Sequence, residues 1–311
     1  MIEVKIPATS ANLGSGFDAL GLALTMYNTV YMEEWDGIDI ASLDGMEVPT
    51  GEDNLICATA RRLYEICGKP FRGLRIRQKN DIPMARGLGS SSACLVGGLL
   101  GANTLLGDPL RTEDLLNLSS ALEGHPDNVA PALLGGLVTC AMEEGKVYSV
   151  SVPVAPNVHF AALIPETPLP TSHARSVLPQ SVSRADAVYN LSRAALMTSS
   201  LFSGTLENLR VATGDRLHQP YRMGLIKGSD TAFRIARELG AYGVYISGAG
   251  STIMAIIDKQ NADFAEQIRH QLMLNGVFGW TVRLLESDGV GASVKDGGDA
   301  GVGAVVQAAA T

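Results

Sequence analysis

The sequence predicts a two-domain protein that mixes helices and strands. Its 311 residues exceed what one compact domain usually takes and are enough to bury a large core. Stretches that alternate between apolar and polar residues occur among stretches with helical period. Five prolines lie between Pro153 and Pro170, where the composition shifts. We therefore expect a first domain over residues 1–153, a second over 154–295, and a loosely held tail over 296–311 that is rich in glycine, alanine and valine.

Each expected element of the first half has its own pattern. Alternation predicts strands at the N-terminus, over 28–35 and over 73–80. Helical period or a run of small apolar residues predicts helices over 54–68, 92–106 and 112–124. For the last of these helices we expect Thr112 to be the N-cap. The segments 135–142 and 147–154 are expected to pair as a hairpin.

The second half is expected to contain three longer helices and one strand–turn–strand unit. The helices are predicted over 183–204, where arginines lie on the polar side, over 228–239 and over 261–275. The strand–turn–strand unit is "GVYISGAGSTIMAII", residues 243–257.

Charge and composition narrow the class of protein. The formal net charge is −8, which argues against a nucleic-acid-binding surface and suits a protein that handles small molecules. The four cysteines form no C-x-x-C pair, which indicates buried small hydrophobes in a reducing compartment. No signal peptide is recognisable, and the apolar stretches are too short and glycine-rich to span a bilayer. We expect a cytoplasmic protein that binds neither nucleic acid nor membrane.

The stretch "IPMARGLGSSSACLVGG", residues 82–98, predicts a phosphate-binding loop. A strand precedes it and a helix follows, so free N–H groups and the positive end of the helix dipole meet there. Its glycines allow close approach, and its serine hydroxyls add donors and candidate Mg²⁺ ligands. The alternative is a tight turn followed by an ordinary serine N-cap. It is not a P-loop, because the G-x-x-x-x-G-K-[ST] pattern is absent.

"PMARGLGSSSA" resembles the second signature motif of the GHMP kinases. Within that family, "PATSANLGSGFDALGLAL" and "EGHPDNVAPALLGGLV" resemble the members that phosphorylate homoserine, and "PTSHARSVLP" and "YISGAGSTIMAI" complete the set in order. The resemblance implies an α+β fold in two domains. The N-terminal one is expected to be like ribosomal protein S5 and the C-terminal one to be a ferredoxin-like α/β sandwich, with the active site in the cleft between them. A homodimer, common in the family, is compatible with it.

The resemblance implies that the loop wraps the triphosphate of ATP. The implied contacts are Pro83, Met84, Ala85, Arg86, Gly87, Leu88, Gly89, Ser90, Ser91, Ser92 and Ala93, with Asn54 at the nucleoside. It also implies that Glu123 is a carboxylate ligand of Mg²⁺, with the hydroxyl of Ser91 opposite. Mg²⁺ prefers such hard oxygen ligands. The "SGAGST" segment resembles the third motif of the family, whose glycines let the second domain close on the nucleotide loop.

L-Homoserine is an amino acid, so its site needs an acceptor for the ammonium and cations for the carboxylate. Asp18 suits the ammonium, and two arginines can grip a carboxylate bidentately. The resemblance implies that the substrate contacts are Asn12, Asp18, His125, Asn128, Thr171, Arg175 and Arg222. Each residue alone also has a structural interpretation. Asn12 and Asp18 suit an Asx-turn, the arginines suit the surface, and "EGHPDN" suits a proline-containing turn with a neutral histidine.

For catalysis, the resemblance implies roles for Asn128, Glu123 and Arg175. Our hypothesis is that Asn128 holds the substrate hydroxyl in line with the γ-phosphate and that no side chain acts as the base. Asp127 remains an alternative base. The product would be O-phospho-L-homoserine, on the route to threonine. Two rival functions stay open: a GHMP kinase for another small alcohol, and a catalytically silent member that senses ATP or an amino acid.

Overall fold

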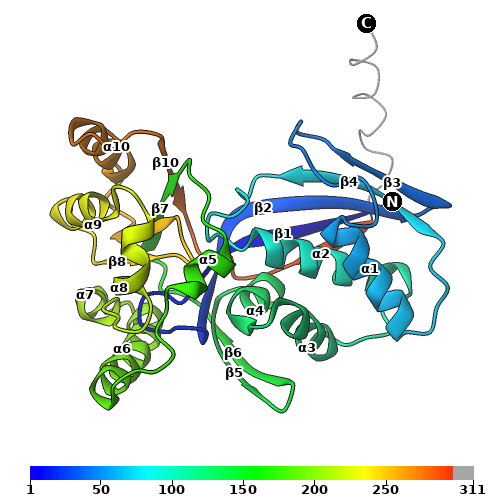
Figure 1. The fold of residues 1–311 in the computed structure, drawn as a ribbon, viewed down its shortest axis with the longest axis horizontal. Coiled ribbons are helices and arrows are strands. Elements are labelled where there is room, and N and C mark those ends of the chain that lie inside the picture. The colour runs from blue at the N-terminus through cyan, green and yellow to red at the C-terminus, as the bar shows by residue number, and fades with distance from the viewer. Residues whose placement is uncertain (297–311) are drawn as a thin grey trace, which may run out of the picture.

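Two β-sheets lie side by side in the computed structural model, which describes residues 1–296 (Figure 1). The sheet on the right of Figure 1 is built mainly from the first half of the chain, and the smaller sheet on the left from the second half. The mixture of helices and strands that the sequence predicts is confirmed.

The larger sheet has seven strands among the described residues, in the order β11-β1-β2-β4-β3, with β5 paired to β2 and β6 paired to β5. All its neighbours are antiparallel except β3 and β4. Along β2, buried and half-buried side chains alternate from Met26 to Met32, which is the period of a strand with one covered face. The strands are β1 (Ile2–Ala11), β2 (Leu20–Glu34), β3 (Gly37–Ser42), β4 (Gly73–Asn80), β5 (Leu137–Glu143), β6 (Lys146–Val152) and β11 (Ser293–Asp296).

Four helices cover one face of this sheet (Figure 1): α1 (Leu55–Ile66), α2 (Ser90–Leu105), α3 (Thr112–Glu123) and α4 (Pro126–Leu134). One sequence prediction about them is wrong, because Thr112 is the first residue of α3 and not its N-cap. The N-cap is Arg111, whose backbone N–H donates to the carboxylate of Asp114 at 3.1 Å. The acidic side chain in the first turn thus satisfies a free backbone donor.

The smaller sheet has four antiparallel strands among the described residues, in the order β10-β7-β9-β8. They are β7 (Val158–Pro165), β8 (Gly243–Ile246), β9 (Ile253–Asp258) and β10 (Trp280–Leu285). The second-half helices are α5 (Thr171–Ser176), α6 (Arg184–Ser203), α7 (Leu209–Ala212), α8 (Gln219–Arg222), α9 (Ser229–Glu238) and α10 (Phe264–Leu274), with 3₁₀ turns η1 (Leu206–Asn208) and η2 (Met223–Leu225). None of the helices in residues 1–296 is both long and apolar enough to cross a membrane.

The two halves are joined more closely than a simple linker would allow. The chain passes from the larger to the smaller sheet between Val152 and Val158, but β11 returns to pair with β1, so residues 293–296 lie in the larger sheet. The division into 1–153 and 154–295 therefore stays a prediction. Of the expected tail, 296–311, only Asp296 is described, as the last residue of β11. The rest lies outside the described residues.

Candidate active site

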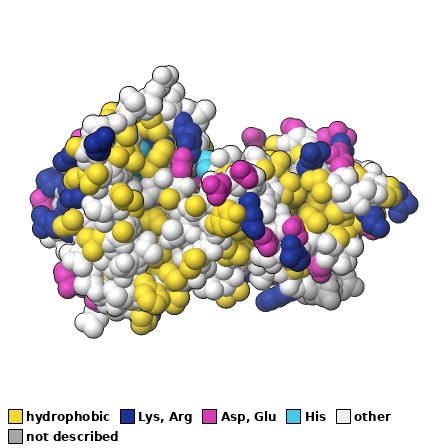
Figure 2. Space-filling view, turned by 90° about the horizontal axis from the view of Figure 1, so that it is seen from below, with side chains coloured by type: hydrophobic (Ala, Val, Ile, Leu, Met, Phe, Trp, Pro, Cys, Tyr) yellow, Lys and Arg dark blue, Asp and Glu magenta, His cyan; other side chains and the backbone are white. Residues whose placement is uncertain are grey.

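A pocket lies where the loops of the two sheets meet. Figure 2 shows acidic, basic and histidine side chains gathered near the waist of the molecule. Most residues that the sequence predicted for the site line this one pocket: Asn12, Asp18, Ala85, Arg86, Gly87, Gly89, Ser90, Ser91, Ser92, Glu123, His125, Asn128, Thr171, Arg175 and Arg222. Asp127, Gly248 and Ala249 line it too. The fold brings together segments that are far apart in the sequence.

The remaining predicted residues do not line this pocket. Leu88 and Ala93 are buried in the core, whereas Met84 is half exposed. Asn54 is buried and caps α1, since its Oδ1 accepts from the backbone N–H groups of Ile56 and Cys57. Its Nδ2 donates to Pro49 O and Gln78 Oε1. The last of these residues is Pro83, at the start of the loop. The side chain of Asn54 therefore has a structural use in helix α1.

The loop before α2 has the backbone of an anion site. Ala85, Gly87 and Gly89 have positive φ angles of 53°, 76° and 71°, and Gly89 is the N-cap of α2. Left-handed residues in such a loop allow successive N–H groups to turn to the same side, the arrangement that binds anions. The positive end of the α2 dipole faces the same place.

The third-motif loop of the second half holds the loop before α2 in place. Ser247 Oγ donates to Gly87 O at 2.6 Å, and the backbone N–H of Thr252 donates to Arg86 O at 3.0 Å. A Cβ at Gly87 would lie 2.2 Å from Ser247 O, so only glycine allows this approach. The Arg86 side chain donates to the carbonyls of Met84, Pro165 and Glu166. Arg86 thus fastens the loop to the end of β7.

Two serines and a glutamate form an oxygen-rich cluster at the start of α2. Ser91 Oγ donates to one carboxylate oxygen of Glu123 at 3.2 Å, and Ser92 Oγ donates to the other at 2.9 Å. Glu123 ends α3, and the serines stand in the first turn of α2. A hydroxyl and a carboxylate next to an anion-binding loop are the donor types that suit a hard divalent cation. The residues present therefore fit Mg²⁺.

Asp18 and Arg175, expected to bind opposite ends of an amino acid, bind each other in this structure. Arg175 Nη2 lies 2.7 Å from Asp18 Oδ1, and Nη1 lies 3.1 Å from Oδ2. The carbon Cζ of Arg175 also stands 5.6 Å from the centre of the Phe17 ring. Both charged side chains are about one-third exposed, at 35% and 37%, so a charged ligand can reach them from the pocket.

Arg222 is a buried charged group of the site. Its side chain is buried, yet it lines the pocket. Its Nε donates to Ala174 O at 3.2 Å, and its Nη1 donates to Gly248 O at 2.9 Å. Burial, followed by the charge of Arg175, lowers the pKa of Arg222 to about 10, which still leaves it protonated at neutral pH.

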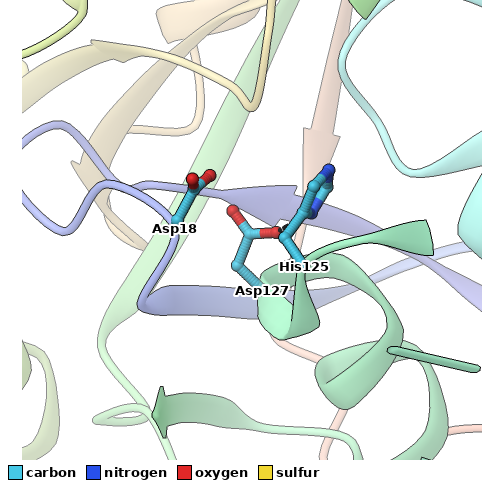
Figure 3. A group of neighbouring side chains, drawn as sticks. All are labelled: Asp18, His125 and Asp127. Carbon is cyan, nitrogen blue, oxygen red and sulfur yellow. Dashed lines mark hydrogen bonds and ion pairs between the residues drawn. The ribbon is translucent and has the colours of Figure 1, made fainter. Parts of the chain in front are cut away.

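His125, Asp127 and Asn128 form a chain of polar contacts at the start of α4. His125 Nδ1 lies 2.6 Å from Asp127 Oδ1, and Asn128 Nδ2 donates to the same oxygen at 3.3 Å. Thr9 Oγ1 donates to Asn128 Oδ1 at 2.8 Å and so orients its amide. Figure 3 shows Asp127 between His125 and Asp18, whose carboxylate comes from the loop after β1.

The charge of Asp127 also affects the protonation of His125. Burial acts to lower the pKa of His125, but the hydrogen bond to Asp127 and its negative charge outweigh burial and raise the pKa above its ordinary value. Ligand atoms of Asp18, His125 and Asp127 all lie within 4.8 Å of one another. The pocket therefore has a locally acidic wall that can accept hydrogen bonds from a cationic group.

Sequence reasoning missed four residues that support the site: Thr9, Phe17, His218 and Ser247. Thr9 and Phe17 lie in "PATSANLGSGFD" and Ser247 lies in "SGAGST", two stretches singled out for other residues. His218 lies four positions before Arg222. Their positions within those stretches were the available signal. The contact of His218 with Arg222 is local, four positions along the chain. The other partners, Asn128 for Thr9, Gly14 for His218 and Gly87 for Ser247, lie in other segments, and nothing local indicates them.

Comparison with known proteins shows the family to which the chain belongs. The family model for the N-terminal domain of GHMP kinases matches residues 54–136, and the model for their C-terminal domain matches residues 196–272. Each half of the chain thus carries one of the two GHMP kinase domains. The anion-binding loop lies within the first match, and the third-motif loop that closes on it lies within the second.

Relatives that match nearly the whole chain show the group of GHMP kinases to which it belongs. A homoserine kinase from Clostridium beijerinckii is 45% identical over 300 residues, which cover 96% of this chain and 99% of the relative. One from Caldicellulosiruptor bescii is 42% identical over 297 residues, covering 94% and 97%. The crystal structure of homoserine kinase from Cytophaga hutchinsonii superposes with a TM-score of 0.83 at 28% identity, covering 94% of this chain and 97% of that one. The chain belongs to the homoserine kinases of the GHMP kinase family.

Proposed function

We propose that this protein transfers the γ-phosphoryl group of ATP to the side-chain hydroxyl of L-homoserine, giving ADP and O-phospho-L-homoserine. The observation that carries the proposal is that one pocket holds both an anion-binding loop and a set of opposite charges suited to an amino acid. In the cell, we assign the reaction to threonine biosynthesis in the cytoplasm.

The amino-acid side of the pocket is matched to a zwitterion. Asp18 accepts hydrogen bonds from the substrate ammonium, while Arg175 and the buried Arg222 bind its carboxylate. Within residues 1–296 the hydrogen bonds of Arg222 use Nε and Nη1, which leaves Nη2 for the substrate. Three further pocket-lining side chains complete the proposed contacts: Asn12, His125 and Thr171.

The phosphate side of the pocket binds ATP through the loop 85–89 and the first turn of α2. The free N–H groups there cradle the phosphates, because Gly87 and Gly89, which carry no side chain, line the pocket beside the start of α2. Ser91 and Glu123 would hold Mg²⁺, which neutralises phosphate charge when it is bound with the nucleotide. Asn54 at the nucleoside stays a prediction, since its amide already caps α1.

The chemical step needs positioning more than covalent help. The hydroxyl oxygen of homoserine forms a bond to the γ-phosphorus as the bond from that phosphorus to the β-bridging oxygen breaks. The hydroxyl proton passes to a phosphoryl oxygen, so no side-chain base is required. Asn128, oriented by Thr9, holds the hydroxyl in line, and Arg175 offsets the spreading negative charge.

The test is ADP release by the purified protein with MgATP and a panel of alcohols. The panel contains L-homoserine, D-homoserine, L-serine, L-threonine, mevalonate and galactose. Release confined to L-homoserine supports the proposal. Release with mevalonate or galactose would overturn the amino-acid site, and no release despite measurable ATP binding would favour a sensor.

A further inference from the structure

His218, a buried histidine behind the pocket, connects the loop after β1 to helix α8. It immediately precedes α8, and its side chain is fully buried. Its Nε2 lies 2.7 Å from Gly14 O, and its Nδ1 lies 3.1 Å from Arg222 Nη1. Its ring stacks on Phe17 with the ring centres 5.2 Å apart and the planes at 24°.

These partners permit only one protonation state of the ring. A carbonyl oxygen such as Gly14 O can only accept, so Nε2 must carry the hydrogen. A guanidinium can only donate, so Nδ1 must be free to accept from Arg222. His218 is therefore the neutral tautomer with hydrogen on Nε2. Burial lowers its pKa, which also favours this neutral form.

The surroundings of His218 hold it rigidly. The carboxylate of Asp215 accepts from the backbone N–H groups of Leu217, His218 and Gln219, which fixes the turn that leads into α8. Asn190 Nδ2 donates to Asp215 Oδ1 at 2.6 Å and to Ser15 O at 2.9 Å, which ties this turn to the loop after β1. The backbone of His218 is thus fixed by Asp215, and its ring nitrogens contact Gly14 O and Arg222 Nη1.

The acceptor nitrogen Nδ1 of His218 matters because it helps to fix the orientation of the Arg222 side chain. Nη1 of Arg222 is shared between His218 Nδ1 and Gly248 O, while Nε bonds to Ala174 O. These three acceptors fix the plane of the guanidinium, and so fix the direction of Nη2, the group left for the substrate carboxylate. A buried arginine without its acceptor would turn to find another partner.

We propose that His218 is a positioning residue for amino-acid binding, acting through the orientation of Arg222. The inference rests on the proposed function, because it assigns Arg222 to the carboxylate of the substrate. It predicts that the acceptor at the Nδ1 position, rather than the bulk of the ring, sets the affinity for L-homoserine.

Two amide variants separate the acceptor from the rest of the ring. In His218→Asn, the amide oxygen stands where Nδ1 stands and can still accept from Arg222. In His218→Gln, the amide reaches the Nε2 position and can donate to Gly14 O, but the Nδ1 acceptor is lost. Both variants lose the stack on Phe17, so that loss is matched.

The measurements are the KM values for L-homoserine and MgATP, kcat, and calorimetric binding of L-homoserine without ATP. We expect the L-homoserine KM and Kd to rise about 10- to 100-fold in His218→Gln, the range for losing a hydrogen bond to a charged group. In His218→Asn the rise should stay below about threefold. kcat and the MgATP KM should change little in either variant, and circular dichroism should show both folded. In an Arg222→Lys background, His218→Gln should have little further effect.

The outcomes distinguish this inference from the proposed function. Equal losses in the two amide variants, or losses in kcat and the MgATP KM alone, would overturn the positioning role. An undiminished loss from His218→Gln in the Arg222→Lys background would also overturn it. Failure of the unmodified protein to phosphorylate or bind L-homoserine would instead overturn the proposed function.

Discussion

Asp18 and Arg175 form a bidentate ion pair, with 2.7 Å between Oδ1 and Nη2 and 3.1 Å between Oδ2 and Nη1, although 157 positions separate them in the chain. The pair joins the loop after β1 to helix α5, and so connects the larger sheet to the first helix of the second half. Both side chains face the pocket, where the proposed substrate carries the same two charges. The two charges of the proposed amino-acid site are therefore paired with each other in the structure.

We expect Asp18→Asn to raise the KM for L-homoserine about 10- to 100-fold, because a charged hydrogen-bond acceptor for the ammonium is lost. The KM for MgATP should stay within about twofold of the unmodified value. Stability should fall by no more than about 1 kcal/mol, since both partners are more than one-third exposed and solvent screens the pair. Initial-rate kinetics and urea unfolding measure these effects.

Asp186→Asn is the matched control for that prediction. Asp186 also pairs with an arginine, at 3.1 Å from Arg216 Nη1, and its side chain is 34% exposed. It does not line the pocket. Equal rises of the L-homoserine KM in the two variants would contradict the role of Asp18.

Glu123→Gln should lower kcat at ordinary Mg²⁺ by about 100-fold or more, because the amide is a poorer ligand for the cation that offsets several kcal/mol of transition-state charge. The L-homoserine KM should change little. Rates measured over a range of Mg²⁺ concentrations check this, with Glu113→Gln as the control, an exposed acid that pairs with Lys146 away from the pocket. Full kcat in Glu123→Gln would show that the metal assignment is wrong.

Asp127→Asn tests whether the transfer needs a side-chain base. Asp127 is buried, and its Oδ1 contacts both His125 and Asn128, which makes it a support for those side chains. We expect kcat to remain within about tenfold of the unmodified value, below the 10²- to 10⁴-fold that a general base contributes. Loss of turnover with both KM values intact would make Asp127 the base.

Gly87→Ala should destabilise the protein and raise the KM for MgATP. The new methyl would meet Ser247 O at 2.2 Å, and the positive φ of 76° adds backbone strain. Overpacking costs about 1–3 kcal/mol, beyond about 1–2 kcal/mol for the left-handed backbone. Gly107→Ala isolates the strain alone, because Gly107 has a φ of 81° and no atom within 4 Å of its added Cβ. Equal unfolding free energies for the two variants would refute the close approach.

Much of the fold was predictable because its local patterns survive burial. The hairpin of β5 and β6, and the unit formed by β8 and β9, match the predicted stretches. Two other elements lack the usual sequence pattern of a strand or a helix. β2 begins at Leu20, well before the alternating stretch at Asn28, since its first residues are buried on both faces and so do not alternate. Helix α4 carries an internal proline, Pro131, and its sequence suggested only a turn.

From the amino-acid order alone, Gly-Leu-Gly-Ser-Ser-Ser predicts a loop that leads into a helix N-terminus, and so indicates which short stretch is suited to an anion. How the side chains of different stretches meet depends on the packing of the whole chain. Arg222 had a surface position as its alternative, yet it is buried between Ala174, His218 and Gly248. Local periodicity records which side of an element faces the core, but a polar contact between distant segments depends on how the sheets and loops pack. That packing places Arg222 in the wall of the pocket and supplies the acceptors that orient it.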